Sequence, residues 1–291
     1  MSREKVIEVG LLNVVIHPHN PELYLELFRD AKRRKLTGRI NRSRAARLGP
    51  FEELDIGTNG TIVVGRLYFY SDIDSGKPWL DDSINDAADE NKLSGIKSEL
   101  RKLHPEFKYM RYILNPKTHR IYFEVRNEEG KSFSPATVHK AFSSIFTDQG
   151  ILEKFNEVTF TVIPETDTLN KIYAIEQLKR LRIELSTPNP DDWDDEFKEI
   201  QDMLDRQKAK SLTHELTRKK GTESLEPDDF TKKLARVAAE NGKVTGFGRS
   251  RGMSVVESTA SHPSIKKYTL RIGEAAPIER FKEFVITLLF K

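Results

Sequence analysis

Residues 158–192 constrain the fold more than any other part of the chain. Alternating apolar residues over 158–163 predict a strand, which ends at Pro164 because proline has no amide proton for a strand ladder. A turn and a short helix follow, and apolar residues over 178–185 predict a second strand. Two closely spaced prolines then stop that strand. This order of elements predicts a sheet covered by helices.

The central run, LNKIYAIEQLKRLRIELSTPNPDD, carries a resemblance. Together with the strand before it and the late segment HPSIKKYTLRI, it resembles a family of bacterial proteins of unknown function and of about this length. More loosely, the chain is similar to the phage-exclusion protein RexA in its order of elements. The resemblance covers most of the chain and identifies no catalytic residue. It implies a bacterial, phage-linked, DNA-associated protein, and it is compatible with a homo-oligomer and a partner protein of a defence system.

The whole pattern predicts an α+β fold with two lobes, each a mainly antiparallel or mixed sheet covered by helices. Asn20 as a cap and Pro21 at the first helical position predict a helix that extends to about Lys35. We expect three regions: an N-terminal α+β region over 1–108, a central ββαβαβ-like lobe over 109–210, and a C-terminal helix with strands over 211–291 that packs back on the body.

Three segments carry more specific expectations. Asn59-Gly60 predicts a two-residue hairpin turn. The polar segment 211–226 is expected to be a linker or a frayed helix. The terminal segment 278–289 fits either a helix or a strand.

Composition narrows the possible functions. The chain is 37% hydrophobic and 32% charged, which is typical of a soluble globular protein. The absence of cysteine excludes disulfides, thiolate zinc sites and cysteine nucleophiles. No apolar run approaches the ~20 residues that cross a bilayer, and the N-terminus lacks a signal-peptide core. We therefore expect a cytoplasmic protein with no membrane partner.

A run of basic residues is the main candidate for a binding site. Residues 32–48 contain eight basic side chains and no acidic one, although the net charge is only +3. The compensating acidic residues lie elsewhere, in a predicted surface loop over 72–90 and over 191–196. Cations up to Lys35 suit the end of the predicted helix, but the later arginines have no such explanation. We expect a flexible arm that binds nucleic acid through Arg33, Arg34, Lys35, Arg39, Arg42, Arg44 and Arg47.

The glycine-rich segment 246–252, with Arg249 and Arg251, is a second candidate. Its glycines would let backbone amides approach a phosphate, although the same residues also suit an ordinary hairpin turn. The basic run itself contains no aromatic residue, which argues against stacking of single-stranded bases. The predicted partner is therefore duplex DNA, bound largely without sequence specificity.

Two other functions stay open. Asp191 and Asp192 could bind a metal ion in a nuclease or toxin effector, although the start of a helix also favours acidic residues. Alternatively, the basic run docks an acidic partner in a scaffold of a defence system. His17 and His19 could bind a metal with a distant carboxylate, but such pairs are more often structural. No Walker A, HExxH, GxSxG or GxGxxG motif occurs, so we predict no catalytic residue, metal or cofactor.

Overall fold

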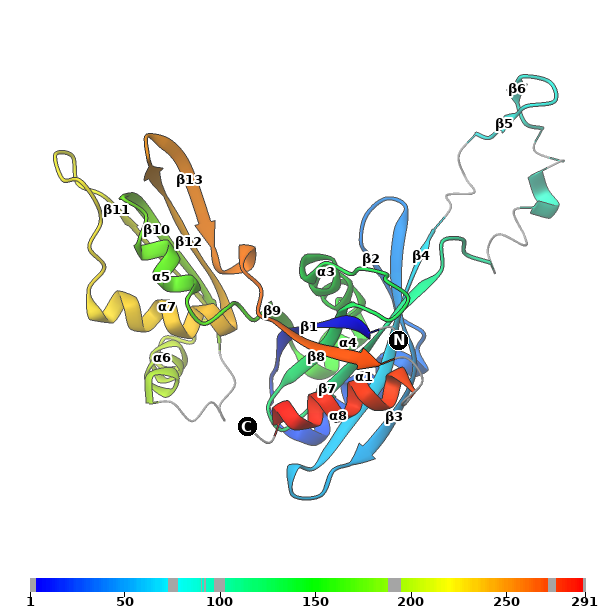
Figure 1. Cartoon of the computed structure of the whole chain (residues 1–291), viewed down its shortest axis with the longest axis horizontal. Helices are drawn as coiled ribbons and strands as arrows, with labels where there is room; N and C mark the ends of the chain where they lie inside the picture. The colour runs from blue at the N-terminus through cyan, green and yellow to red at the C-terminus, as the bar shows by residue number, and fades with distance from the viewer. Residues whose placement is uncertain are drawn as a thin grey trace.

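The computed structural model describes residues 4–72, 78–89, 91, 93–96, 103–187, 195–271 and 276–289. The prediction of an α+β fold with two lobes is confirmed, since two mainly antiparallel sheets each pack against helices (Figure 1). None of the described helices is long and apolar enough to cross a membrane.

An eight-stranded sheet forms the first lobe. Seven strands follow the order β14-β1-β8-β7-β4-β3-β2, and β9 pairs with the second half of β1. Every one of these pairings is antiparallel. The strand bounds are β1 (Glu4–Ile16), β2 (Thr37–Arg39), β3 (Arg44–Asp55), β4 (Thr61–Ser71), β7 (Lys108–Asn115), β8 (Arg120–Arg126), β9 (Val158–Val162) and β14 (Ile265–Arg271).

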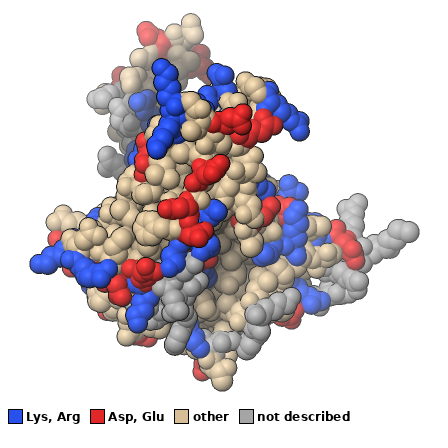
Figure 2. All heavy atoms as spheres, turned by 90° about the vertical axis from the view of Figure 1, so that its left-hand side faces the viewer, with Lys and Arg blue, Asp and Glu red and all other residues tan. Residues whose placement is uncertain are grey.

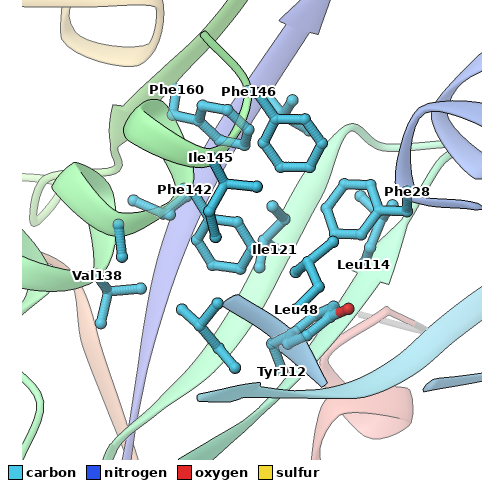
Figure 3. Packing of buried hydrophobic residues seen from close by; sticks show 14 of the residues in the cluster. Phe28, Leu48, Tyr112, Leu114, Ile121, Val138, Phe142, Ile145, Phe146 and Phe160 are labelled. Atoms are coloured by element: carbon cyan, nitrogen blue, oxygen red, sulfur yellow. The ribbon is translucent and has the colours of Figure 1, made fainter. Parts of the chain in front are cut away.

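The main core of this lobe lies between one face of the sheet and three helices, α1 (Pro21–Arg33), α3 (Pro135–Ile145) and α4 (Gln149–Phe155). Each helix begins after a capping residue whose side chain accepts a backbone N–H of the first turn, namely Asn20, Ser134 and Asp148. Phe28, Phe142 and Phe146 then project from the helices towards Tyr112 and Phe160 of the sheet (Figure 3). Buried aromatic rings of this size fix how the helices seat on the sheet.

The opposite face of the same sheet is covered by α8 (Pro277–Leu289), which lies across part of it in Figure 1. Phe281 and Val285 of α8 are fully buried, and Phe284 stacks on Tyr268 with ring centres 4.6 Å apart. The terminal segment is therefore a helix. On β4 the cluster that packs with α8 includes Ile62 and Val64, whereas Arg66, which follows on the same face, is exposed.

A four-stranded antiparallel sheet forms the second lobe, in the order β11-β10-β12-β13. Leu181 and Ile183 of β10 pack with Leu234 and Val237 of α7 in its core. The elements are α5 (Thr168–Tyr173), β10 (Gln177–Ser186), α6 (Asp195–Arg206), β11 (Ser211–Thr217), α7 (Asp229–Asn241), β12 (Gly242–Ser250) and β13 (Met253–Ser258).

The two lobes are joined by polar contacts as well as by the chain. Asn13 of β1 donates from Nδ2 to Oδ1 of Asn241 at 2.9 Å, and both residues are buried. Arg120 of β8 forms an ion pair with Glu240 of α7. The predicted central region, 109–210, contributes β7, β8 and β9 to the first sheet and β10 to the second, so the sheets do not follow the boundaries of the three expected regions.

Three local expectations need correction. The predicted linker over 211–226 contains β11, which pairs with β10 along its whole length. The β3–β4 hairpin closes through a 3-10 turn, Gly57–Asn59, followed by Gly60 at φ +79°, rather than through a two-residue turn. Within the predicted acidic loop over 72–90, a short hairpin joins β5 (Leu80–Asp81) to β6 (Asp86–Ala87).

Candidate nucleic-acid interface

The basic run forms secondary structure, so the prediction of a flexible arm is wrong. Arg33 ends α1, Arg39 ends β2 and Arg44 begins β3. β2 and β3 pair with each other from Thr37↔Arg47 to Arg39↔Ala45. The alanines and isoleucine interspersed with the arginines are buried, and this burial fixes the backbone of the hairpin.

Three of the predicted arginines already have carboxylate partners. Arg33 contacts Asp30 at 2.6 Å, Arg34 contacts Asp148 at 2.7 Å, and Arg39 contacts Asp72 at 3.1 Å. Lys35 is exposed and has a positive φ of 53° just after α1. These ion pairs reduce the positive charge that the first part of the run offers to a ligand.

Arg44 belongs to a different environment, which we call the basic pocket: Arg44 and Lys108 line a cavity of about 180 Å³ beside the first turn of α3, and Lys131 is a further electrostatic neighbour of Lys108. Burial, followed by repulsion from Arg44 and Lys131, lowers the pKa of Lys108. Its Nζ lies 4.9 Å from the centre of the Phe133 ring. Within the described part of the chain, none of the three cations forms an ion pair.

The surroundings of the basic pocket add one carboxylate and one helix start. Glu106 also lines the cavity, and its carboxylate accepts the hydroxyl of Ser71 at 2.5 Å. Thr137, in the first turn of α3 where the helix dipole is positive, also lines the cavity. Three cations and a helix start against one carboxylate leave the pocket positive.

Arg47 points to the other face of the sheet, because side chains alternate along β3. There it joins what we call the aromatic face: Arg47, Arg66, Tyr68, Tyr70, Phe107 and Tyr109. Tyr68 of β4 lies opposite Tyr109 of β7. The guanidinium of Arg66 is 4.9 Å from the centre of the Tyr109 ring, and that of Arg47 is 6.0 Å from the Tyr70 ring.

The glycine-rich segment 246–252 belongs to the second sheet and forms the β12–β13 hairpin. Its tip is Arg251-Gly252, both at positive φ. A Cβ on Gly248 would lie 2.3 Å from the carbonyl oxygen of Gln177, so packing between strands explains that glycine without a phosphate. Arg249 and Arg251 are exposed there, and Figure 1 shows β12 and β13 in the other lobe from β3 and β7.

Charge on the side of the second lobe is mixed. Figure 2 looks at this side and shows Lys and Arg interspersed with Asp and Glu rather than one continuous basic surface. Some of these cations are paired, as in the contact between Lys233 and Glu199 at 2.5 Å. The predicted cations therefore divide between two lobes, and of these Arg44 belongs to the basic pocket.

The other side-chain clusters are structural. Arg111 is 4% exposed and contacts Glu124 at 2.8 Å and Glu128 at 2.5 Å. His19 bonds to the hydroxyl of Tyr24 at 2.9 Å and packs edge-on against His119. Among the described residues, no group of three or more His, Cys, Asp or Glu side chains could hold a metal ion. Asp191 and Asp192, the candidates for a nuclease, lie outside those residues.

Comparison of the sequence with protein families identifies the family of the chain. The family described as a domain of unknown function, DUF4747, matches residues 5–286. The chain belongs to this family. The DUF4747 match covers both sheets and nearly all of the helices, which confirms the expectation of an uncharacterised family. None of the curated proteins compared with the chain matches it.

Sequence reasoning missed the members of the interface that come from distant segments. Lys108, Lys131 and the rings of the aromatic face lie outside the basic run, and only strand pairing brings them beside it. One signal was available, since Tyr68, Tyr70, Phe107 and Tyr109 form two dense aromatic segments. The register between β4 and β7 was needed to place them together.

Proposed function

We propose that this chain is a non-enzymatic, cytoplasmic protein that binds duplex DNA, largely without sequence specificity, through the basic pocket and the β2–β3 hairpin. The observation that carries the proposal is the grouping of Arg44, Lys108 and Lys131. Like charges held together raise the energy of the folded state, and a phosphate anion lowers it. Arg44 begins β3, Lys108 begins β7 and Lys131 lies between β8 and α3, so chance placement along one helix does not explain them.

The structure changes which residues should matter most. Arg42 is exposed in the β2–β3 turn beside Arg44, and it adds a guanidinium suited to two-pronged contact with a phosphate. Arg33, Arg34 and Arg39 must first give up carboxylate partners, so we expect them to contribute less. Phosphate contacts carry no sequence information, which fits binding that is indifferent to sequence.

The test is binding of the purified protein to a labelled DNA duplex across a salt series with magnesium present. We expect affinity that falls steeply with salt and a substrate that stays intact. The triple variant Arg42→Gln, Arg44→Gln, Lys108→Gln should bind more weakly, with a salt slope smaller by about 0.9 for each phosphate that the variant no longer neutralises. The matched control, Arg33→Gln with Arg34→Gln, removes two cations whose partners are acidic residues of this chain and should bind nearly as the parent does.

Two results would overturn the proposal. Absence of duplex binding at ~150 mM salt would favour a scaffold whose basic surface docks an acidic protein, because phosphate-driven binding remains measurable there. Cleavage of the DNA in magnesium would favour the nuclease alternative. The double variant Asp191→Asn, Asp192→Asn would then test whether these two residues are needed for cleavage.

A role in phage exclusion, with assembly into a homo-oligomer and a partner protein, is part of the proposal and rests on the resemblance of the central run to RexA. The test compares phage plating on bacteria that express the parent or the triple variant. We expect the parent to reduce plating and the variant to lose that effect. Equal plating on cells with and without the parent would remove this role and leave DNA binding as a separate question.

A further inference from the structure

The aromatic face differs from the part of the sheet beneath α8 because Phe107 is exposed and Tyr68 and Tyr109 are half-buried, whereas Tyr70 is buried with its ring 4.4 Å from that of His104. Phe107 is 59% exposed, although its ring centre lies 5.1 Å from that of Tyr68 and 6.5 Å from that of Tyr109. On the same face, α8 buries the side chains of Ile62, Val64 and Ile113. On one face of the sheet, the apolar half is therefore buried by α8, whereas the aromatic half leaves Phe107 exposed.

Ordinary sheet packing accounts for part of this surface. Tyr68 and Tyr109 are directly opposite each other on neighbouring strands, and such pairs stabilise a sheet. Packing does not account for Phe107, which precedes β7 and exposes most of its ring to solvent. A large exposed ring between two tyrosines and beside guanidinium groups is more typical of a recognition surface.

The chemistry of the face fits a single nucleic-acid strand. Unpaired bases expose flat π surfaces that stack on aromatic rings and on guanidinium planes, whereas a duplex hides those surfaces inside its stack. Arg66 and Arg47 lie next to the rings and can also contact phosphates. The nearby acidic groups are engaged elsewhere, because Asp72 contacts Arg39 and Glu106 accepts the Ser71 hydroxyl.

We infer that the aromatic face binds single-stranded DNA, with bases stacked on Phe107 and Tyr109 and phosphates held by Arg66 and Arg47. The choice of DNA rests on the proposed function, whereas the stacking geometry does not depend on it. The face and the basic pocket occupy opposite faces of the same end of β3, β4 and β7. One molecule can therefore hold a duplex and an adjoining single strand.

The first experiment measures fluorescence anisotropy of a labelled thymidine oligomer, on the order of 10 nucleotides long, with the full chain. The double variant Phe107→Leu, Tyr109→Leu keeps apolar side chains but loses the rings. We expect its affinity to fall at least about fivefold, the effect of losing one stacked base. The matched control, Phe107→Tyr with Tyr109→Phe, keeps both rings and should keep the parental affinity. Unchanged binding by the leucine variant would overturn the inference.

Further binding measurements distinguish failure of this inference from failure of the proposed function. The triple variant of the basic pocket should lose duplex affinity and keep oligomer affinity, whereas the leucine variant should show the reverse. If the triple variant alone abolishes both, the aromatic face is not a separate site. A uridine RNA oligomer that binds more tightly than the thymidine oligomer would overturn the choice of DNA. If light scattering shows that the leucine substitutions dissociate an oligomer, the face is a contact between copies and not a DNA site.

Discussion

Two cations on the same strand, Arg111 and Lys108, have opposite surroundings. Arg111 is buried and is held by Glu124 and Glu128. Lys108 lies at the open start of β7, half-buried, and its electrostatic neighbours include two further cations. A buried cation enclosed by carboxylates is part of the fold, because breaking the group leaves an uncompensated charge. Around Lys108 the cations Arg44 and Lys131 outnumber the one carboxylate, Glu106, so positive charge remains available to an anion, as expected of a binding site.

The contrast between Arg111 and Lys108 would fail most clearly if replacing Arg111 left the stability of the fold unchanged. The Arg111→Met variant leaves Glu124, which is 1% exposed, without its cation. We expect the free energy of unfolding to fall by about 3–5 kcal/mol, measured by urea denaturation. Arg249→Met, an exposed arginine in the second lobe, is the control and should change stability by less than about 0.5 kcal/mol. A loss for Arg111→Met no larger than that of the control would contradict a structural role.

The pH dependence of that loss gives a second check. Burial, the largest influence, raises the pKa of Glu124 from 4.5 to about 7 despite the guanidinium. A carboxyl with a raised pKa in the folded state contributes stability that is present below its unfolded value and is lost as pH rises through the folded value. A protonated Glu124 needs no cation, so the loss caused by Arg111→Met should shrink as pH falls below about 7. A loss that grows on acidification would contradict this account.

Removal of one carboxylate should have a smaller effect. The Glu128 side chain is 18% exposed. In the Glu128→Gln variant, Arg111 keeps its contact with Glu124. We expect a loss of about 1–3 kcal/mol in thermal or urea unfolding, because the amide still accepts one hydrogen bond. A loss equal to that of Arg111→Met would show that the two carboxylates act as one inseparable unit.

An exposed ion pair from the predicted arm should matter less still. Arg34 and Asp148 contact at 2.7 Å, but their side chains are 37% and 32% exposed. The Arg34→Gln variant should lose between zero and about 1 kcal/mol of stability, and less at high salt. Its duplex affinity should stay close to that of the parent, measured by anisotropy. A strong loss of affinity would place Arg34 in the DNA contact after all.

The smallest change in stability is expected at the basic pocket. Lys108→Met removes a cation whose pKa is lowered by burial and by Arg44 and Lys131, so stability should be unchanged or slightly higher while duplex affinity falls. The lowered pKa means that the charge opposes folding at neutral pH, and this cost disappears as pH rises towards 10.5, the ordinary value. Any gain in stability over the parent should therefore diminish in alkali. A marked loss of stability would show that Lys108 supports the fold.

Local signals predicted elements wherever the determinants lie close together in sequence. Asn20 and Pro21 predicted the start of α1, and the Asn20 cap is present. The segment 211–217 was missed because its alternation is weak, with polar residues at the exposed positions of an edge strand. Pairing with β10, rather than propensity, makes it a strand.

The basic run shows where prediction from sequence ends. The sequence alone shows its positive charge and its lack of acidic residues, and these two features predict a phosphate-binding site. The run itself contains no aromatic ring, but the strands beside it bring in Tyr68, Tyr70 and Tyr109. A linear pattern records which residues are near in sequence, and a surface depends on which strands are neighbours.

The sequence by itself determined the α+β class, the caps and most strands, because these depend on alternation, proline and capping within a few residues. Only the tertiary structure decided which cations are compensated and which are not. Carboxylates of their own or distant segments form ion pairs with Arg33, Arg34 and Arg39. Arg44, in contrast, is an electrostatic neighbour of Lys108, as is Lys131. Coulomb interactions depend on distance in space, and that distance is set by packing of the whole chain.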